Sequence, residues 1–300
     1  MSSTGAPRTR RRSRRRFRAL EALAWVSPAL LVIAFVYGYG IYRLIEEALH
    51  RDGAYVGLGN FHIVFRDPLF RSAVRHNLQL ILVGLPLIVV VALLISILLY
   101  EGMRGWRVHR AVVFVPYLLP VAVVGVLFGQ ILTLHGLLNS SLAELGLGSL
   151  TRDWLGNPDY ALSSLIGVIV WKELGFGVII FLARLFALPT EVYEAARADG
   201  AGWWRQHWHV SLPGLRPIIL FYLVIEGITL LSWVFNYVFV MTGGGPGNAT
   251  GVIETYVYSN LITYRLGWLA ASAATVVLAS VAILAILVLA GRRIIARRAA

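Results

Sequence analysis

The sequence of 300 residues contains no cysteine, a single lysine and few charged side chains of any kind. Without cysteine the chain has no disulfide, no thiolate metal site and no cysteine nucleophile. Charged residues make up 14% of the sequence and hydrophobic residues 58%, whereas an average soluble domain is roughly a quarter charged and half apolar. This composition excludes an ordinary cytosolic enzyme and a disordered chain.

The apolar residues gather in blocks long enough to cross a membrane. About 20 helical residues span the hydrocarbon core, and helices satisfy their own backbone polar groups there. The blocks therefore predict an all-α integral membrane protein with six transmembrane helices, at residues 23–44, 77–100, 111–134, 161–186, 217–240 and 267–290. Several of these spans contain proline, which favours a bundle whose neighbouring helices satisfy the freed carbonyls.

The distribution of arginine predicts the orientation of these spans. Residues 1–20 carry eight arginines without apolar periodicity, which predicts a disordered cytoplasmic arm. A signal peptide is disfavoured, because the following apolar stretch is long and no small-residue cleavage site follows it. With the arm inside, nineteen arginines lie on the cytoplasmic side and seven outside, so both termini are expected in the cytoplasm. The net charge of +12 is then assigned to topology and anionic lipid, and no nucleic-acid partner is expected.

One predicted cytoplasmic loop, residues 191–213, has helical features of its own. Its first part consists of good helix formers. Gly200 and Gly202 then permit a sharp turn, because glycine tolerates positive φ. A second amphipathic stretch follows, and Pro213 is expected to end it before the fifth span. The loop is thus predicted to form a rigid helical protrusion suited to a groove on a partner protein.

Two segments match a family pattern. Glu194-Ala195-Ala196, Gly200 after three residues, and Val210-Ser211-Leu212-Pro213 after nine more resemble the EAA-x3-G-x9-I-x-L-P motif. That motif belongs to permease subunits of binding-protein-dependent ABC importers, and valine in place of isoleucine is the one departure. MTGGGPGNAT at 241–250 resembles the T-x-GGP segment of the carbohydrate-uptake branch, in the subunit like the first permease of maltose and glycerol-phosphate systems. Segments 56–78 and 136–142 look like the same branch.

This resemblance implies a type I ABC importer permease fold in a bacterial plasma membrane. It implies a non-catalytic subunit that works with a second permease, two ATPase subunits and an extracytoplasmic substrate-binding protein. ATP and Mg²⁺ would bind to the ATPase; no cofactor or metal is expected on this chain, whose glycine run lacks the Lys-Ser/Thr of a phosphate-binding loop. The expected parts are the arm 1–20, a first helix with its external segment 21–72, the permease core 73–290 and a basic tail 291–300.

By the same resemblance, the helix around Glu194 and Gly200 sits in a cleft of the ATPase and transmits its closure to spans four and five. Only a rigid element anchored at both ends can transmit such a displacement. The residues implied in this coupling are Glu191, Glu194, Ala195, Ala196, Asp199, Gly200, Leu212 and Pro213.

Polar side chains inside the spans suggest a second site, because charge at membrane depth is costly and usually faces a bundle interior or a wet cavity. Aligned on the motif, the family's sugar site falls on the spans before and after it. The implied path residues are Lys172, Glu173, Phe176, Glu226, Thr229 and Trp233. Charges here replace neutral residues of the family, which favours a polar, charged or amino-bearing ligand. The alternative is an internal pair of Lys172 with Glu173 or Glu226 that stabilises the bundle.

Two other functions remain open at this point. The first is the same importer for a non-sugar solute such as a polyamine, a peptide or a phosphodiester, against which the GGGP segment argues. The second is a self-contained secondary transporter, which predicts inverted repeats and discontinuous helices. No such repeat is evident in the sequence, and this alternative leaves the 191–213 loop unexplained.

Overall fold

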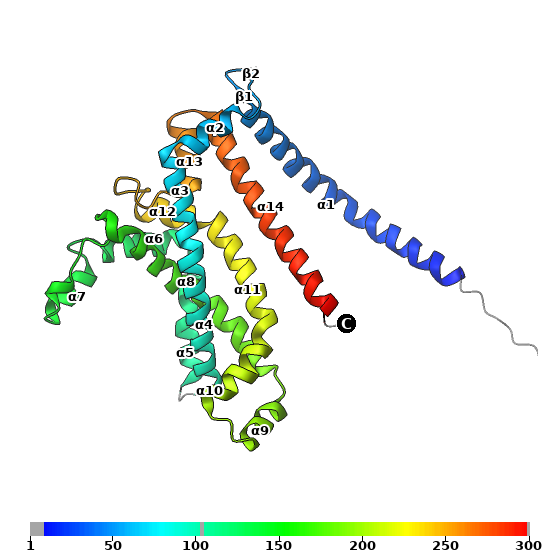
Figure 1. Ribbon diagram of the computed structural model, residues 1–300, viewed down its shortest axis with the longest axis vertical. Coiled ribbons are helices and arrows are strands. Elements are labelled where there is room, and N and C mark those ends of the chain that lie inside the picture. The colour runs from blue at the N-terminus through cyan, green and yellow to red at the C-terminus, as the bar shows by residue number, and fades with distance from the viewer. Residues whose placement is uncertain (1–8, 103–104, 299–300) are drawn as a thin grey trace, which may run out of the picture.

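The computed structural model describes the backbone of residues 9–102 and 105–298, and the side chains from Trp25 onward except at 103–104, 106–107, 284–285 and 287–300. Within these ranges the chain is helical apart from loops and one short hairpin (Figure 1). The first half consists of α1 (Thr9–Leu49), β1 (His50–Arg51), β2 (Ala54–Tyr55), α2 (Gly59–Arg66), α3 (Pro68–Gln79), η1 (Leu80–Gly84), α4 (Leu85–Tyr100), α5 (Trp106–Leu118), α6 (Val121–Ile131), α7 (Leu137–Glu144) and η2 (Gly148–Leu150). The second half consists of α8 (Pro158–Phe186), α9 (Thr190–Ala198), α10 (Trp203–Gln206), η3 (His207–Ser211), α11 (Leu212–Ser232), α12 (Val234–Met241), α13 (Ile253–Tyr258), η4 (Ser259–Thr263) and α14 (Gly267–Arg298).

The helical class is confirmed, but six spans are not. Among the described residues, four helical stretches are long and apolar enough to cross a membrane: Trp25–Leu49, Pro68–Tyr100, Pro158–Phe186 and Trp203–Ser232. A fifth arises if the bent pair Val108–Leu118 and Val121–Ile131 counts as one span. The sixth predicted span corresponds to α14, whose described apolar part, Gly267–Ile283, is shorter than these.

The third predicted span, 111–134, is broken rather than continuous. Its two halves, α5 and α6, meet at an angle of 98°. Leu119 is extended between them, with φ −71° and ψ 137°, because the ring of Pro120 disfavours a helical conformation in the residue before it. After the bend, α6 lies against α12, where a Cβ on Gly125 would come within 2.8 Å of Val240. The kink therefore directs the second half of this span sideways across the bundle (Figure 1).

Two other prolines are accommodated without a break. Pro86 follows the π-helical turn η1, and Pro213 follows the π-helical turn η3. In η3 the N–H of Leu212 donates to the carbonyl of His207, five residues back. This wider turn makes room where the proline ring would otherwise meet the carbonyl four residues before it. The expectation that Pro213 ends a helix before span five is therefore wrong: the helix runs on from Trp203 to Ser232.

The ends of other predicted segments also differ. The second span begins at Pro68 rather than at residue 77, and the fifth is divided at Trp233, which separates α11 from α12. The prediction of a disordered arm is wrong from Thr9 onward, where α1 already begins; arginine is a good helix former, so the apolar helix extends backward into the arm. The side chains of the arm and of the tail 291–300 lie outside the described residues.

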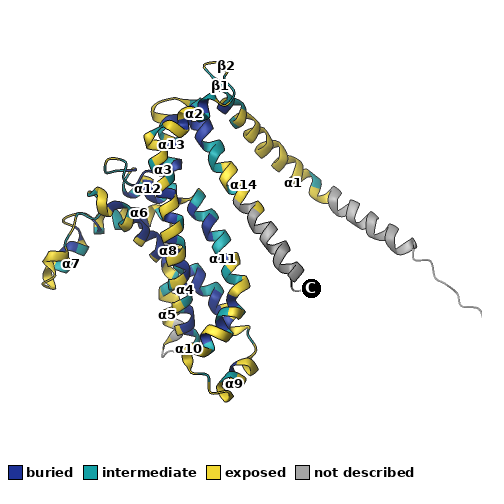
Figure 2. Cartoon of the chain, viewed as in Figure 1, coloured by how far each residue is buried: buried dark blue, intermediate teal, exposed yellow. Residues whose placement is uncertain are grey.

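The core forms where α8 packs against α4, α5 and α11. Two glycines on α8 permit this close approach, since small residues let helix backbones come together. A Cβ on Gly175 would lie 2.6 Å from the carbonyl oxygen of Val113, and one on Gly177 would lie 2.8 Å from the ring of Tyr222. By contrast, α1 diverges from this bundle and is largely exposed along its described side chains (Figure 2).

The bundle has two distinct ends. One carries α9 and α10 beside the end of α4, and the opposite end carries the hairpin, α2 and α13 (Figure 1). At the hairpin end, Asn60 donates hydrogen bonds to the carbonyls of Ala48 (2.9 Å) and His50 (2.8 Å) and accepts one from Arg51 (3.0 Å). The loop 191–213 thus lies at the opposite end from the hairpin, α2 and α13 (Figure 1).

Replacing Glu254 by glutamine is expected to reduce the pH dependence of stability. Both carboxylate oxygens of Glu254 are buried, and burial raises the pKa of this carboxyl to about 7, against a smaller opposing effect of Asn77. The pKa of Glu254 is higher in the folded state than in the unfolded state. Its contribution to the free energy of unfolding is therefore full below the ordinary pKa and is lost as pH rises through about 7. Thermal unfolding in detergent from about pH 5 to about pH 8.5 measures this loss. The exposed Glu144→Gln serves as control, and an unchanged slope in Glu254→Gln would contradict the assignment.

Candidate functional site

The loop 191–213 contains a short helix closed by a tight turn. Helix α9 ends at a Schellman turn, in which the N–H of Ala201 donates to the carbonyl of Ala196 (2.9 Å) and that of Gly200 donates to Arg197 (3.0 Å). Gly200 has a φ of +73°, which favours glycine because a Cβ crowds the backbone in this region. The turn leads the chain directly into α10, so the C-terminal end of α9 is anchored.

Most residues predicted to couple to an ATPase are exposed on α9, on the turn that follows it or at the start of α11. Glu191, Glu194, Ala195, Asp199, Gly200 and Pro213 are exposed, whereas Ala196 and Leu212 are half-buried. The single buried residue of α9 is Tyr193. The helix therefore buries one side chain against the rest of the chain and presents small and acidic residues outward, a surface that another protein can approach closely.

Tyr193 belongs to a hydrogen-bonded chain that sequence reasoning did not find. Its hydroxyl lies 2.9 Å from the hydroxyl of Ser211, and His207 Nδ1 lies 2.8 Å from the same oxygen. His207 Nε2 lies 2.9 Å from Oε1 of Glu101, the residue that follows α4. His207 is 3% exposed, and burial raises the pKa of Tyr193, which keeps its proton. No motif marks this chain, because Glu101 and His207 are 106 positions apart.

A second polar cluster lies inside the bundle, between α5, α8 and α12. Lys172 Nζ is 3.3 Å from Oε1 of Glu173 and 3.4 Å from the backbone carbonyl of Tyr117. The hydroxyl of Tyr237 donates to the same Glu173 oxygen at 2.5 Å. Lys172 also stands 5.3 Å from the centre of the Tyr117 ring, a cation–π distance. The ion pair therefore has polar partners on α5 and α12 as well as on α8.

Aromatic rings line this cluster on the α11 side. Phe176 stacks on Tyr117 with ring centres 5.2 Å apart and lies 5.9 Å from Tyr222. The hydroxyl of Tyr222 donates to the backbone carbonyl of Glu173 (3.1 Å). Sequence reasoning missed the three tyrosines 117, 222 and 237, since tyrosine is common at helix interfaces and none stands in a distinctive spacing.

The remaining predicted path residues do not all join this cluster. Glu226 is 2% exposed, and its Oε1 has no hydrogen-bond partner. The hydroxyl of Thr229 donates to its own helix at Ile225 (3.0 Å). Trp233 is 61% exposed at the break after α11, so it faces outward. The structure therefore brings Lys172, Glu173 and Phe176 together, encloses Glu226 within the bundle, and places Trp233 elsewhere.

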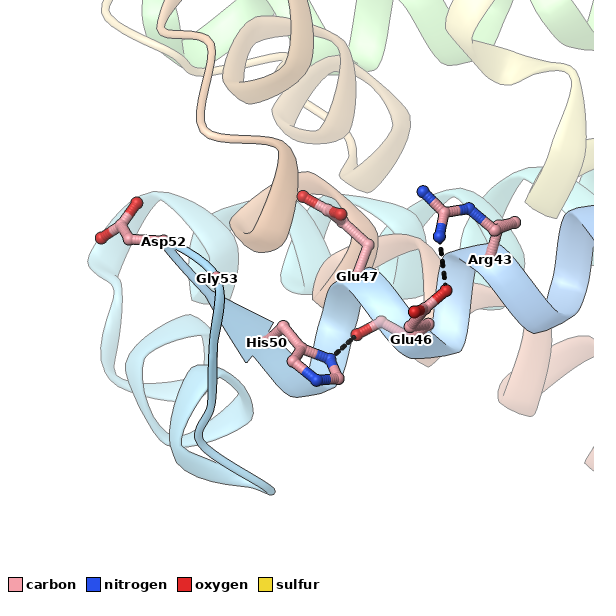
Figure 3. Close-up of a pocket in the computed structure, with 6 residues that line it drawn as sticks. All are labelled: Arg43, Glu46, Glu47, His50, Asp52 and Gly53. Atoms are coloured by element: carbon pink, nitrogen blue, oxygen red, sulfur yellow. Dashed lines mark hydrogen bonds and ion pairs between the residues drawn. The ribbon is translucent and has the colours of Figure 1, made fainter.

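A surface pocket at the hairpin end touches neither site. It measures about 340 Å³ and is lined by Arg43, Glu46, Glu47, His50, Asp52 and Gly53 (Figure 3). Arg43 pairs with Glu46 at 2.6 Å on the surface, where solvent weakens such pairs. Within the described residues, no three His, Cys, Asp or Glu side chains stand close enough to hold a metal ion.

Comparisons with known proteins show the family to which this chain belongs. Residues 80–300 match the model of the binding-protein-dependent transport system inner membrane component. The probable ABC transporter permease protein YurN of Bacillus subtilis is 33% identical over 260 residues, covering 84% of this chain and 88% of that protein. The diacetylchitobiose uptake permease NgcF of Streptomyces coelicolor is 32% identical over 272 residues, covering 85% and 76%. The lactose transport permease LacF of Rhizobium radiobacter is 28% identical over 264 residues, covering 86% and 88%.

A solved structure shares the fold. A chain of a bacterial ABC transporter for import of the acidic polysaccharide alginate superposes with a TM-score of 0.74 at 23% identity, covering 93% of this chain and 99% of that one. Because the family model covers residues 80–300 and the Bacillus relative aligns over 84% of the chain, this protein belongs to the inner-membrane components of binding-protein-dependent transport systems, as a multi-pass, non-catalytic ABC transporter permease subunit.

Proposed function

We propose that this chain is the transmembrane permease subunit of an ATP-driven carbohydrate importer in a bacterial plasma membrane. The observation that carries the sugar assignment is the match, over more than four-fifths of the chain, to permeases whose names describe diacetylchitobiose and lactose uptake. The MTGGGPGNAT segment supports the same branch. A second permease would complete the path, and an extracytoplasmic binding protein would deliver the sugar.

Coupling runs through α9 in this proposal. The exposed acidic and small residues of α9, including Glu191, Glu194 and Ala195, would dock in the ATPase, which binds ATP and Mg²⁺. Closure of the ATPase dimer would displace α9. Because α9 is anchored by the Gly200 turn and by Tyr193, its displacement would pass into α8 and α11. Both termini and α9 would then lie on the cytoplasmic side.

The buried cluster around Lys172 would form part of the closed sugar path. Charged groups at membrane depth usually face a pathway or a bundle interior, and Phe176 offers a ring face against which a sugar can stack. The Lys172–Glu173 pair is satisfied within the chain, whereas Glu226 retains an unpaired oxygen. A ligand hydroxyl or amine could hydrogen-bond to that oxygen once the path opens. Thr229, also on α11, would line the same path.

Reconstitution tests this proposal directly. The chain is co-expressed with its neighbouring permease, ATPase and binding-protein genes, and ATP-dependent uptake is measured with labelled disaccharides, a polyamine, a dipeptide and a phosphodiester. The expected result is saturable disaccharide uptake that requires the ATPase, with which the chain copurifies. Uptake of another solute class alone would replace the sugar assignment, and uptake by the chain alone would support a secondary transporter.

A further inference from the structure

The chain of hydrogen bonds behind α9 connects three elements that are distant in the sequence. Tyr193 lies on α9, Ser211 and His207 lie on the π-helical turn η3, and Glu101 follows the last turn of α4. Tyr193, Ser211 and His207 are 6%, 0% and 3% exposed. Such buried polar groups hold a fixed geometry, because each loses several kcal/mol of hydration that only its partner replaces.

The donors and acceptors of this chain can all be paired. The carboxylate of Glu101 only accepts, so Nε2 of His207 carries a proton and donates to it. Nδ1 of His207 and the hydroxyl of Tyr193 both meet the oxygen of Ser211, which can donate one hydrogen bond and accept others. The carboxylate at the end therefore fixes the proton on Nε2 and holds the ring in place.

Aromatic contacts reinforce the same connection. The Tyr100 ring, one residue before Glu101, lies 5.7 Å from the Tyr193 ring and 5.4 Å from the ring of Phe186 at the end of α8. Trp203 meets His207 edge to face at 4.5 Å. The end of α4 therefore contacts α9 directly as well as through η3.

We propose that Glu101 and His207 are positioning residues that link the ATPase-facing helix α9 to the cytoplasmic end of α4. A displacement of α9 would then move the Pro68–Tyr100 span together with α8 and α11. Along the sequence, α9 follows α8 and is joined to α11 through α10 and η3. The motif therefore accounts for a connection of α9 to α8 and α11. Among the described residues, the Glu101–His207 hydrogen bond and the Tyr100–Tyr193 contact add a connection to α4 that the motif does not contain. Because α4 packs along α8 in the core, movement of both would change the path as a unit. This inference rests on the proposed role of α9 as the coupling element.

The coupling ratio tests this assignment. In the reconstituted importer, uptake and ATP hydrolysis are measured side by side for the wild type, Glu101→Ala and Glu101→Gln. We expect Glu101→Ala to lower uptake about tenfold or more while ATP hydrolysis continues, because His207 then has no hydrogen bond to the end of α4; a tenfold loss corresponds to about 1.4 kcal/mol. Glu101→Gln keeps an oxygen that accepts from His207 Nε2 and is expected to retain most of the uptake. A wild-type ratio in Glu101→Ala, or equal losses in both variants, would overturn the proposal.

A distance measurement separates this role from a general structural one. Because the chain has no cysteine, spin labels at Leu98→Cys on α4 and Ala198→Cys on α9 are unique. Both positions are exposed. We expect the label distance to stay constant on ATP binding in the wild-type background and to change when Glu101→Ala is added. A change of equal size in both backgrounds would contradict the proposed link between α9 and α4. If the wild type neither binds an ATPase nor transports with ATP, the proposed function itself fails, and this outcome is distinct from the first two.

Discussion

Replacing Gly200 by valine is expected to abolish ATP-driven uptake, whereas the same replacement at Gly202 is expected to leave most of it intact. Neither glycine has an atom within 4 Å of the position where a Cβ would stand, so crowding is the same at both. They differ in backbone conformation: Gly200 has a φ of +73° and Gly202 a φ of −66°. A β-branched residue is costly in the first region and ordinary in the second.

The loss at Gly200 follows from the turn that closes α9. Strain of about 1–3 kcal/mol for a bulky residue at positive φ would open the bonds to Ala196 and Arg197 and release one anchor of the helix. A loosened α9 would absorb the displacement of the ATPase. Uptake, ATP hydrolysis and the amount of inserted permease are measured for both variants. Full uptake in Gly200→Val, or equal losses at the two glycines, would contradict the coupling role of this turn.

Replacing Lys172 by methionine is expected to destabilise the permease strongly. The ammonium group is the cationic partner of Glu173, and both side chains are below a tenth exposed. Removing one partner of a buried pair leaves the other charge uncompensated, at a cost of about 3–5 kcal/mol. Thermal unfolding in detergent measures the loss. The matched control is Arg43→Met, which breaks the exposed pair with Glu46 and is expected to change stability little.

A double variant separates the structural role of this pair from a transport role. In Lys172→Met/Glu173→Gln both charges are removed, and the Tyr237 hydroxyl can still donate to the glutamine oxygen. Stability is therefore expected to return. If sugar uptake stays low while stability returns, the pair acts in the path. If uptake also returns, the pair only stabilises the bundle. A single Lys172→Met variant as stable as the wild type would contradict the importance of the ion pair.

Features that depend on neighbouring residues were predictable from the sequence. The helical class follows from apolar blocks, and the α9 turn follows from Gly200, because one glycine sets the backbone conformation locally. The proline positions indicated disturbed helices, yet their outcomes differ. The chain bends by 98° at Leu119 and Pro120, whereas Pro86 and Pro213 are absorbed by π-helical turns. Which response occurs depends on the space that packing leaves around each proline.

By itself, the sequence determined the membrane-spanning character, the helical nature of the 191–213 loop and the family pattern, since hydropathy and motif spacing are properties of consecutive residues. Only the tertiary structure decided which buried groups meet. Lys172 pairs with Glu173, Glu226 keeps an unpaired oxygen, and Trp233 faces outward. Glu101 reaches His207 across 106 positions. These outcomes depend on the rotation and approach of whole helices, which small residues such as Gly175 and Gly177 permit and which no local pattern specifies.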